Sequence, residues 1–151
     1  MFKNFKLIGI VCLVMAAIVA FSSCSKEQQI VGKWKITKAK FVGDNIDQDK
    51  GETWVFKEGG KCILHIDEED WEGEYSVKKN TLSLDLGNEY KGSTYTVKRT
   101  LSGDLDLDEF SKKEMAVSGK LKYTYDYTDY EYGEHDSGTD SWSLSYEFEK
   151  K

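Results

Sequence analysis

The sequence has no proline, one arginine (Arg99) and only two histidines among its 151 residues. His65 and His135 have no nucleophile at the spacing that acid–base or covalent catalysis needs, so we expect no enzyme and no cofactor. The lack of proline suits a chain made of strands, in which proline is depleted while Tyr, Trp, Thr and Val are favoured. These absences favour a binding or structural protein.

Cysteine is also scarce, and its positions exclude an internal disulfide. Cys12 lies in an apolar segment near the start, Cys24 ends that segment, and Cys62 is the only cysteine further on. Because Cys62 alternates with Leu64 and Ile66, we expect it to be a small core residue. The domain must therefore be held together by burial alone.

No apolar run is long enough for a membrane span. The run from Leu7 to Phe21 follows Lys3 and Lys6 and stops short of the roughly 20 residues that a spanning helix requires. Residues 1–23 are therefore predicted to be a secretory signal peptide, residues 24–29 a short linker and residues 30–151 one folded domain. Loss of Lys3 and Lys6 with the leader changes the formal charge from −6 to −8. This acidity disfavours nucleic acid as a partner.

The small residues Ser22 and Ser23 before Cys24 resemble a bacterial lipobox. This resemblance implies cleavage before Cys24 and a diacylglycerol on its sulfur, whose acyl chains would tether the protein to a membrane. Ser25 after the cysteine resembles lipoproteins that pass to the outer membrane, on either its periplasmic or its surface face. The alternative is an ordinary signal peptide that is cleaved nearby.

After the linker, hydrophobic residues recur with a period of two. The pattern predicts strands at 31–42, 52–57, 61–66, 71–78, 81–86, from 94 onward, at 114–130 and at 140–149, with a loop at 87–93. Short connections predict antiparallel neighbours, and eight strands can close and remove both edges. We therefore expect an all-β fold, an eight-stranded antiparallel up-and-down barrel. An open sandwich or half-barrel is the alternative.

One passage allows two interpretations. Leu105 and Leu107 keep the alternation of the preceding strand, so that strand either bends through Ser102-Gly103 and continues, or turns there into an extra strand at 105–110. An up-and-down barrel closes antiparallel only with an even number of strands, which favours the bend.

The opening Gly32-x-Trp34 of the first strand, the lipobox-like leader and the short alternating strands resemble the small lipocalin-like lipoproteins of gut-type Bacteroidetes. The resemblance implies a lipocalin-like barrel plugged at one end by Trp34, with Gly32 at the entrance to the strand. It also implies a small, mainly apolar ligand inside the barrel.

The same alternation indicates which residues would line that cavity. The predicted ligand-binding residues are Trp54, Phe56, Trp71, Tyr75, Tyr95, Arg99, Tyr123, Tyr125, Trp142 and Tyr146. If these large rings leave no room, the barrel is filled and the protein acts by contact, as an inhibitor or a subunit of an envelope complex. Its contact face would then be the acidic loops and the hairpin with Tyr130 and Tyr132. This hairpin follows a ladder of alternating tyrosines. The alternation changes between Tyr127 and Tyr130, which predicts a bulge there.

Arg99 lies on the inward stripe and needs a partner if it is buried. It either holds an anionic ligand group or stacks on Trp34 near the closed end, and the second interpretation is favoured.

Acidic residues concentrate in the loops at one end. They either form an acidic mouth that attracts cations or simply stay solvated, and the second interpretation is favoured. The run Asp104-x-Asp106-x-Asp108 lacks the glycine and glutamate of a calcium loop, and Asp67 to Asp70 is commoner as an acidic turn than as a site. No metal site is predicted.

Overall fold

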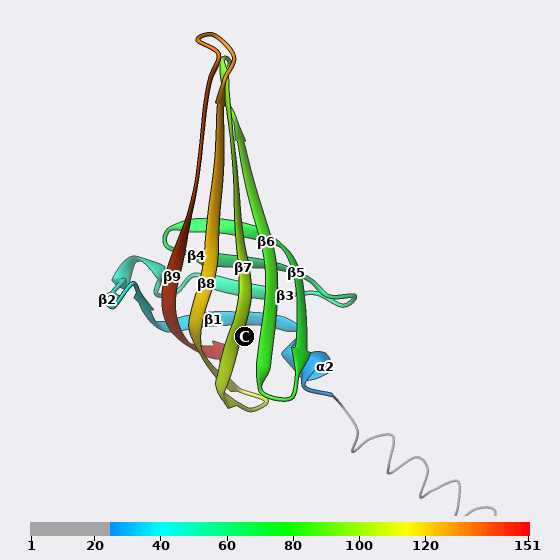
Figure 1. Ribbon diagram of the computed structural model, residues 1–151. Helices are drawn as coiled ribbons and strands as arrows, with labels where there is room; N and C mark the ends of the chain where they lie inside the picture. The colour runs from blue at the N-terminus through cyan, green and yellow to red at the C-terminus, as the bar shows by residue number, and fades with distance from the viewer. Residues whose placement is uncertain (1–24) are drawn as a thin grey trace, which may run out of the picture.

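The computed structural model describes residues 25–151, and they form an antiparallel all-β fold (Figure 1). The predicted all-β class is confirmed. The predictions for the leader and for lipidation of Cys24 lie outside the described residues. None of the helices in residues 25–151 is long and apolar enough to cross a membrane.

A short helix, α2 (Lys26–Ile30), precedes the sheet. The strands are β1 (Gly32–Phe41), β2 (Asp44–Asn45), β3 (Thr53–Phe56), β4 (Lys61–Ile66), β5 (Glu69–Lys78), β6 (Thr81–Lys91), β7 (Tyr95–Phe110), β8 (Glu114–Asp129) and β9 (Glu134–Lys150), and a 3₁₀ turn, η1 (Asp47–Asp49), lies between β2 and β3. Ser25 caps α2 by accepting a hydrogen bond from the backbone N–H of Gln28.

The sheet closes on itself. From β3 to β9 each strand pairs with the next along the chain, and β1 pairs with β3 on one side and with β9 on the other, as in Trp34↔Trp54 and Ile36↔Phe148. Only β2 stands outside this ring, because it pairs with the end of β1 alone. The predicted count of eight strands is therefore wrong: the sheet has nine, the extra one being the two-residue β2.

Two predicted boundaries also differ from the structure. The predicted loop at 87–93 is wrong, since β6 continues to Lys91, and β9 already begins at Glu134. The preferred interpretation of the Ser102-Gly103 passage is confirmed, because β7 runs without interruption from Tyr95 to Phe110. These longer strands change the shape of the molecule.

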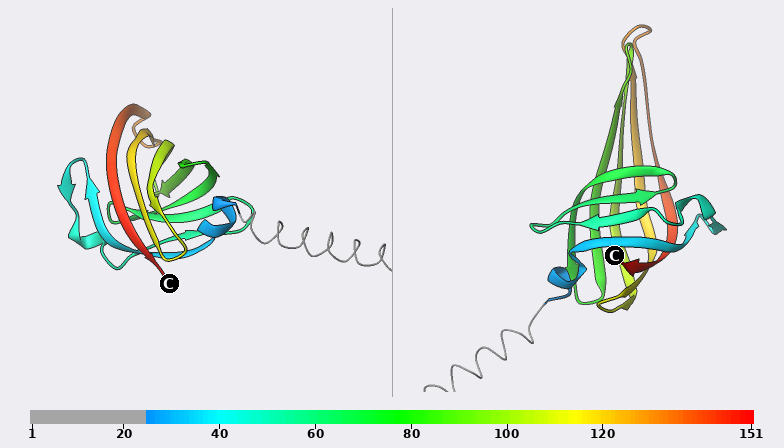
Figure 2. Two further views of the ribbon diagram at one scale, coloured as in Figure 1. Left: turned by 90° about the horizontal axis from the view of Figure 1, so that it is seen from below. Right: turned by 180° about the vertical axis from the view of Figure 1, so that it is seen from behind.

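Four strands extend beyond the ring as a single layer, which we call the projection (Figures 1 and 2). We define it as residues 88–91, 95–100, 124–129 and 134–142. Pairing of β5 with β6 ends at Glu72↔Gly87, and pairing of β1 with β9 ends at Phe41↔Leu144. Above these points β6 to β9 pair only with one another.

Glycines allow the long strands to bend across the ring. Gly103 and Gly119 have φ of +146° and +151°, and a Cβ on either would lie 3.2 Å from a backbone oxygen of the neighbouring strand. An L-residue rarely adopts this backbone conformation, so glycine is needed at this pair of positions.

The core lies inside the ring. Its largest fully buried side chains include Trp34, Trp54, Trp71, Phe56 and Tyr146. Cys62 is 2 % exposed and belongs to this core, as its alternation with leucine and isoleucine predicted.

Replacing Gly73 by alanine tests the close approach of β5 and β6. A Cβ here would lie 2.0 Å from the backbone oxygen of Asp85, so Gly73→Ala should force the strands apart and lower the free energy of unfolding by about 2–3 kcal/mol. Urea denaturation measures this change. Gly87→Ala on β6 is the matched control, because its Cβ would approach the nearest atom at 3.8 Å. Equal effects of the two substitutions would contradict the packing argument.

Candidate functional site

About half of the predicted ligand-binding residues pack against one another inside the ring. Trp54, Phe56, Trp71, Tyr75 and Tyr146 are each at most 5 % exposed. The ring centroid of Trp54 lies 5.3 Å from that of Tyr146, and the ring of Phe56 meets Tyr75 at 4.8 Å in an edge-to-face contact. Contacts of this kind are those of a packed aromatic core.

Trp34 is fully buried close to α2, where its indole Nε1 donates a 2.7 Å hydrogen bond to the backbone oxygen of Ile30. The ammonium group of Lys150 lies 5.0 Å from its ring centroid. The tryptophan thus joins the first strand, the helix and the end of the last strand.

The other predicted aromatic residues lie on the projection or at its base. Tyr95, Tyr123, Tyr125 and Trp142 are only partly buried, and the strand registers place them on one face together with Tyr127. This is the face that points into the core lower down, so we call it the inner face. Above the ring, no other strand of residues 25–151 covers the inner face.

The tyrosine rings of the inner face lie along the sheet. A Cβ on Gly138 would come within 2.4 Å of the Tyr125 ring, and one on Gly92 within 2.6 Å of the Tyr95 ring, so each ring covers a glycine. Tyr123 stacks on Trp142 at 4.2 Å, and Tyr95 lies between Tyr90 and Tyr127 at 5.6 and 5.8 Å. The result is a broad aromatic surface outside the ring.

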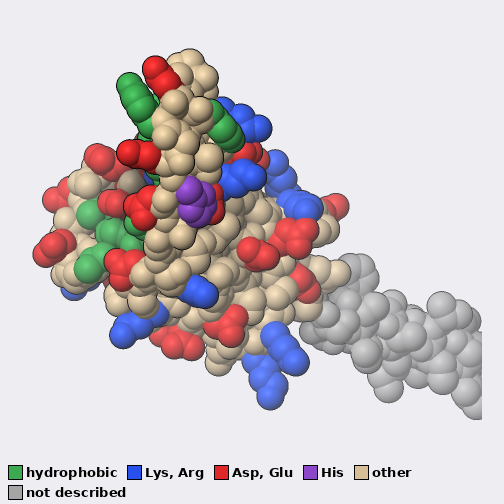
Figure 3. All heavy atoms as spheres, turned by 45° about the horizontal axis from the view of Figure 1, so that its top comes forward, with side chains coloured by type: hydrophobic (Ala, Val, Ile, Leu, Met, Phe, Trp, Pro, Cys, Tyr) green, Lys and Arg blue, Asp and Glu red, His purple; other side chains and the backbone are tan. Residues whose placement is uncertain are grey.

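A row of acidic side chains from β9 borders this aromatic surface. Glu134, Asp136 and Asp140 alternate along the strand, and each lies opposite an inner-face residue of β8, for example Asp140 opposite Tyr123. The hydroxyl of Tyr125 donates to Asp136 at 3.1 Å, and this hydrogen bond raises the pKa of Tyr125. In the space-filling view, hydrophobic side chains at the tip and on one side of the projection lie among acidic ones (Figure 3).

The outer face of the projection has a different character. Threonines and serines dominate it, with Lys98, Lys122 and an Asp126–His135 pair at 3.0 Å. A shallow hollow of about 410 Å³ lies on this face between Lys98 and Thr139. The two faces thus differ in aromatic content and in charge.

Arg99 is held at the base of the inner face. Its Nη1 lies 2.8 Å from Glu69, its Nη2 donates to Asn88 at 3.2 Å, and its guanidinium carbon lies 5.5 Å from the ring centroid of Trp71. The favoured interpretation, stacking on Trp34, is wrong, because the guanidinium lies over Trp71, while Trp34 contacts Phe110 at the far end of β7. Among the buried side-chain atoms of residues 25–151, only Arg99 Nε and Trp71 Nε1 are without a hydrogen-bond partner.

The tip of the projection is a tight turn. Asp129 accepts hydrogen bonds from the backbone N–H groups of Tyr132 and Glu131, at 3.0 and 2.8 Å, and these lower its pKa. Tyr130 and Tyr132 are 68 % and 73 % exposed. The predicted bulge between Tyr127 and Tyr130 is wrong, because β8 keeps its register with β9 up to Asp129, where the turn begins.

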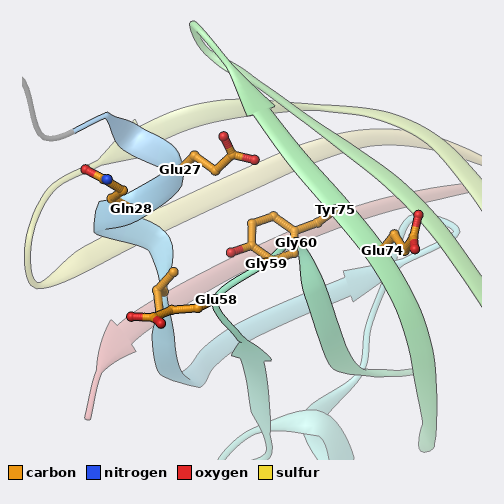
Figure 4. A pocket seen from close by; sticks show the side chains of 8 residues that line it. Glu27, Gln28, Glu58, Gly59, Gly60, Glu74 and Tyr75 are labelled. Carbon is orange, nitrogen blue, oxygen red and sulfur yellow. The ribbon is translucent and has the colours of Figure 1, made fainter.

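The protein also carries a hollow of about 880 Å³ next to α2 (Figure 4). Glu27 and Gln28 come from the helix, Glu58 from the turn before β4, and Glu74 and Tyr75 from β5. Lys61 pairs with Glu74, and the Tyr75 hydroxyl donates to the backbone oxygen of Lys57 at 2.9 Å. This open, carboxylate-rich hollow is outside the ring, so the cavity predicted inside the barrel does not correspond to it.

The chain has no significant match among known proteins. No family model matches it, and searches of the curated proteins and of the solved structures find no significant match. Any function must therefore be inferred from its own residues.

Beside the projection, a buried carboxylate joins three parts of the chain. Asp49 is fully buried and accepts hydrogen bonds from the backbone N–H groups of Asp67 and Glu68, each at 3.0 Å, and from the hydroxyl of Tyr146 at 2.7 Å. His65 lies 3.5 Å from Asp49 and 2.8 Å from Asp70. Burial, and then the hydrogen bond to Asp49, raise the pKa of Tyr146.

This network divides the acidic end that the sequence predicted. Asp49, Asp67 and Glu68 are tied together beside the ring, whereas Glu134 and Asp136 lie out on the projection. The sequence grouped Asp49 only with the other acidic loop residues of that end, whereas the structure buries it. The apolar Ile46 just before it was the one available signal that the loop folds inward. Within residues 25–151, no group of three or more His, Cys, Asp or Glu side chains is arranged to hold a metal ion.

Replacing Asp49 tests this network. Asp49→Asn would replace one carboxylate oxygen, which accepts a hydrogen bond, by an NH₂ group that only donates and would face backbone N–H donors. We therefore expect the free energy of unfolding to fall by about 2–3 kcal/mol in urea denaturation. The control is Asp47→Asn, whose side chain is 78 % exposed and pairs with Lys50, and it should change stability by about 0.5 kcal/mol or less. An Asp49→Asn protein as stable as the control would contradict the network's role.

Cys62 provides a second test of the packed interior. Burial raises the pKa of its thiol to about 12, so almost no thiolate is present at pH 8. We expect a thiol reagent to label Cys62 at pH 8 only at the rate of unfolding, and immediately in denaturant. Because the folded state disfavours the thiolate, stability should also fall as the pH rises from about 9 toward 12. Rapid labelling of the native protein would show that the ring interior opens to solvent.

Proposed function

We propose that the protein is a lipid-anchored, lipocalin-like barrel protein of the outer membrane that acts by contact, binding a partner macromolecule with the inner face of its projection. The observation that carries this proposal is the aromatic surface of Tyr95, Tyr125 and Tyr127 beyond the ring, which Tyr123 continues at its base. Large exposed aromatic surfaces on soluble domains mark interaction sites, and tyrosine is enriched at interfaces. The lipid anchor rests on the motif that ends at Cys24.

The packed interior supports contact as the mode of action. Trp54, Phe56, Trp71 and Tyr146 occupy the space that an enclosed ligand would need, with Trp54 only 4.7 Å from the ring of Phe148. Opening such a core would leave aromatic surface without packing partners, which costs several kcal/mol per ring. A surface outside the ring needs no such rearrangement.

A second candidate is the binding of a small, mainly apolar ligand at the base of the projection. The unpartnered Trp71 Nε1 and Arg99 Nε favour it, since a buried donor without an acceptor is unfavourable. Tyr123 and Trp142 provide aromatic surface close by. A ligand with a carbonyl or carboxylate group and an apolar body would suit this place.

Native mass spectrometry of the full-length protein, extracted in mild detergent from its own envelope, tests the proposal. We expect a retained protein or polymer partner, and at least about tenfold less of it with the double substitution Tyr125→Ser and Tyr127→Ser, because such rings are typical of binding hot spots. The matched control is Thr124→Ser with Thr128→Ser, on the opposite face of the same strand. A small bound mass that Trp71→Phe abolishes would instead favour the second candidate.

A further inference from the structure

One edge of the projection is open. Strand β1 leaves β9 at Phe41↔Leu144, and above that point β9 continues from Trp142 to Glu134 with β8 as its only strand partner within residues 25–151. On the other side, the open stretch of β6 is short, and Asn88 covers its start by donating to the backbone oxygen of Asp70 at 3.1 Å. The long open edge is therefore that of β9.

The direction of the free backbone groups follows from the last contact with β1. The backbone oxygen of Ser143 accepts a hydrogen bond from Val42 at 2.7 Å, so Ser143 points its backbone outward. In an antiparallel strand the N–H and C=O of one residue point to the same side, and the side alternates along the strand. The outward groups above Ser143 therefore belong to Ser141, Thr139, Ser137 and His135.

The side chains along this edge are sorted by charge. Glu134, Asp136 and Asp140 point to the inner face, while His135, Ser137, Thr139 and Ser141 point to the outer face. An added strand would place alternate side chains directly beside this acidic row, where opposite charges across neighbouring strands are favourable. At Gly138 the row is interrupted, and the Tyr125 ring lies there instead.

We propose that the edge of β9 from Glu134 to Trp142 binds an extended segment of a protein whose lysine or arginine residues alternate with small polar ones. This inference rests on the proposed function and names the chemistry of its partner. The segment pairs its backbone with β9, sets its basic side chains against Glu134, Asp136 and Asp140, and sets one of them against the Tyr125 ring. Strand addition of this kind takes affinity from the backbone and specificity from alternate side chains.

Charge argues against a second copy as the occupant. Two β9 edges paired about Gly138 would bring the acidic rows of both chains together, and like charges opposite each other on neighbouring strands are destabilising. The same acids discourage non-specific pairing at an exposed edge. The edge is thus closed to copies of itself and open to a basic segment.

The experiment uses the full-length protein in detergent and a fluorescent peptide as long as residues 134–142, in which lysine alternates with threonine. Fluorescence anisotropy at low salt should show binding. A peptide with glutamate in place of lysine, and one with proline in place of threonine, should not bind. The first reverses the charge, and the second keeps the charge but removes the backbone donors that pair with β9. Equal binding of the lysine–proline peptide would overturn strand addition.

Variants of β9 locate the site. Thr139→Pro removes an outward N–H and leaves the hydrogen bonds to β8 in place, so it should abolish binding, whereas Thr139→Val keeps the donor and should bind normally. Asp136→Asn with Asp140→Asn should weaken binding about tenfold. Unchanged binding by Thr139→Pro, or self-association that this variant abolishes, would overturn the inference.

The two experiments distinguish failure of this inference from failure of the proposed function. If the protein retains a native partner through Tyr125 and Tyr127 but does not bind the lysine–threonine peptide, the inner face is the contact surface and the inference about the β9 edge is wrong. If it retains no partner and binds no peptide, both fail.

Discussion

A mismatch in strand length determines the form of this protein. β1, β3, β4 and β5 have 10, 4, 6 and 10 residues, whereas β7, β8 and β9 have 16, 16 and 17. A closed sheet can pair the long strands with the short ones only over part of their length. The remainder pairs with itself and leaves the ring as a single layer.

A single layer has no core, so its stability must come from contacts across its own surface. In the projection these contacts are ring on ring, as in Tyr90–Tyr95–Tyr127, and ring on glycine, as in Tyr125 over Gly138. Hydrogen bonds from Tyr125 to Asp136 and from the tip to Asp129 add to them. The rings that support the layer are also those that it exposes, which joins its stability to its contact surface.

The ring and the projection have different roles. The ring is packed with aromatic side chains and is closed beside the projection by the Asp49 network, which ties the turn at Asp67 and Glu68 to Tyr146 on β9. The open edge of β9 extends directly from this packed base. The base also carries α2, and with it the chain that leads back to the predicted anchor at Cys24.

The sequence by itself determined the all-β antiparallel class, most strand positions, the bend at Ser102-Gly103 and the core position of Cys62, because alternation with a period of two directly reflects which face is buried. It also identified most of the aromatic residues of the packed core and of the inner face. It did not separate Trp54 and Tyr146, inside the ring, from Tyr95 and Tyr125, outside it, because all keep the same alternation.

Only the tertiary structure decided that separation, since it depends on where β1 and β5 stop pairing with their longer neighbours. It likewise decided the partners of Arg99, the burial of Asp49 and the open edge of β9. Each of these features joins residues far apart in the chain, and a local sequence pattern does not tell which distant residues meet.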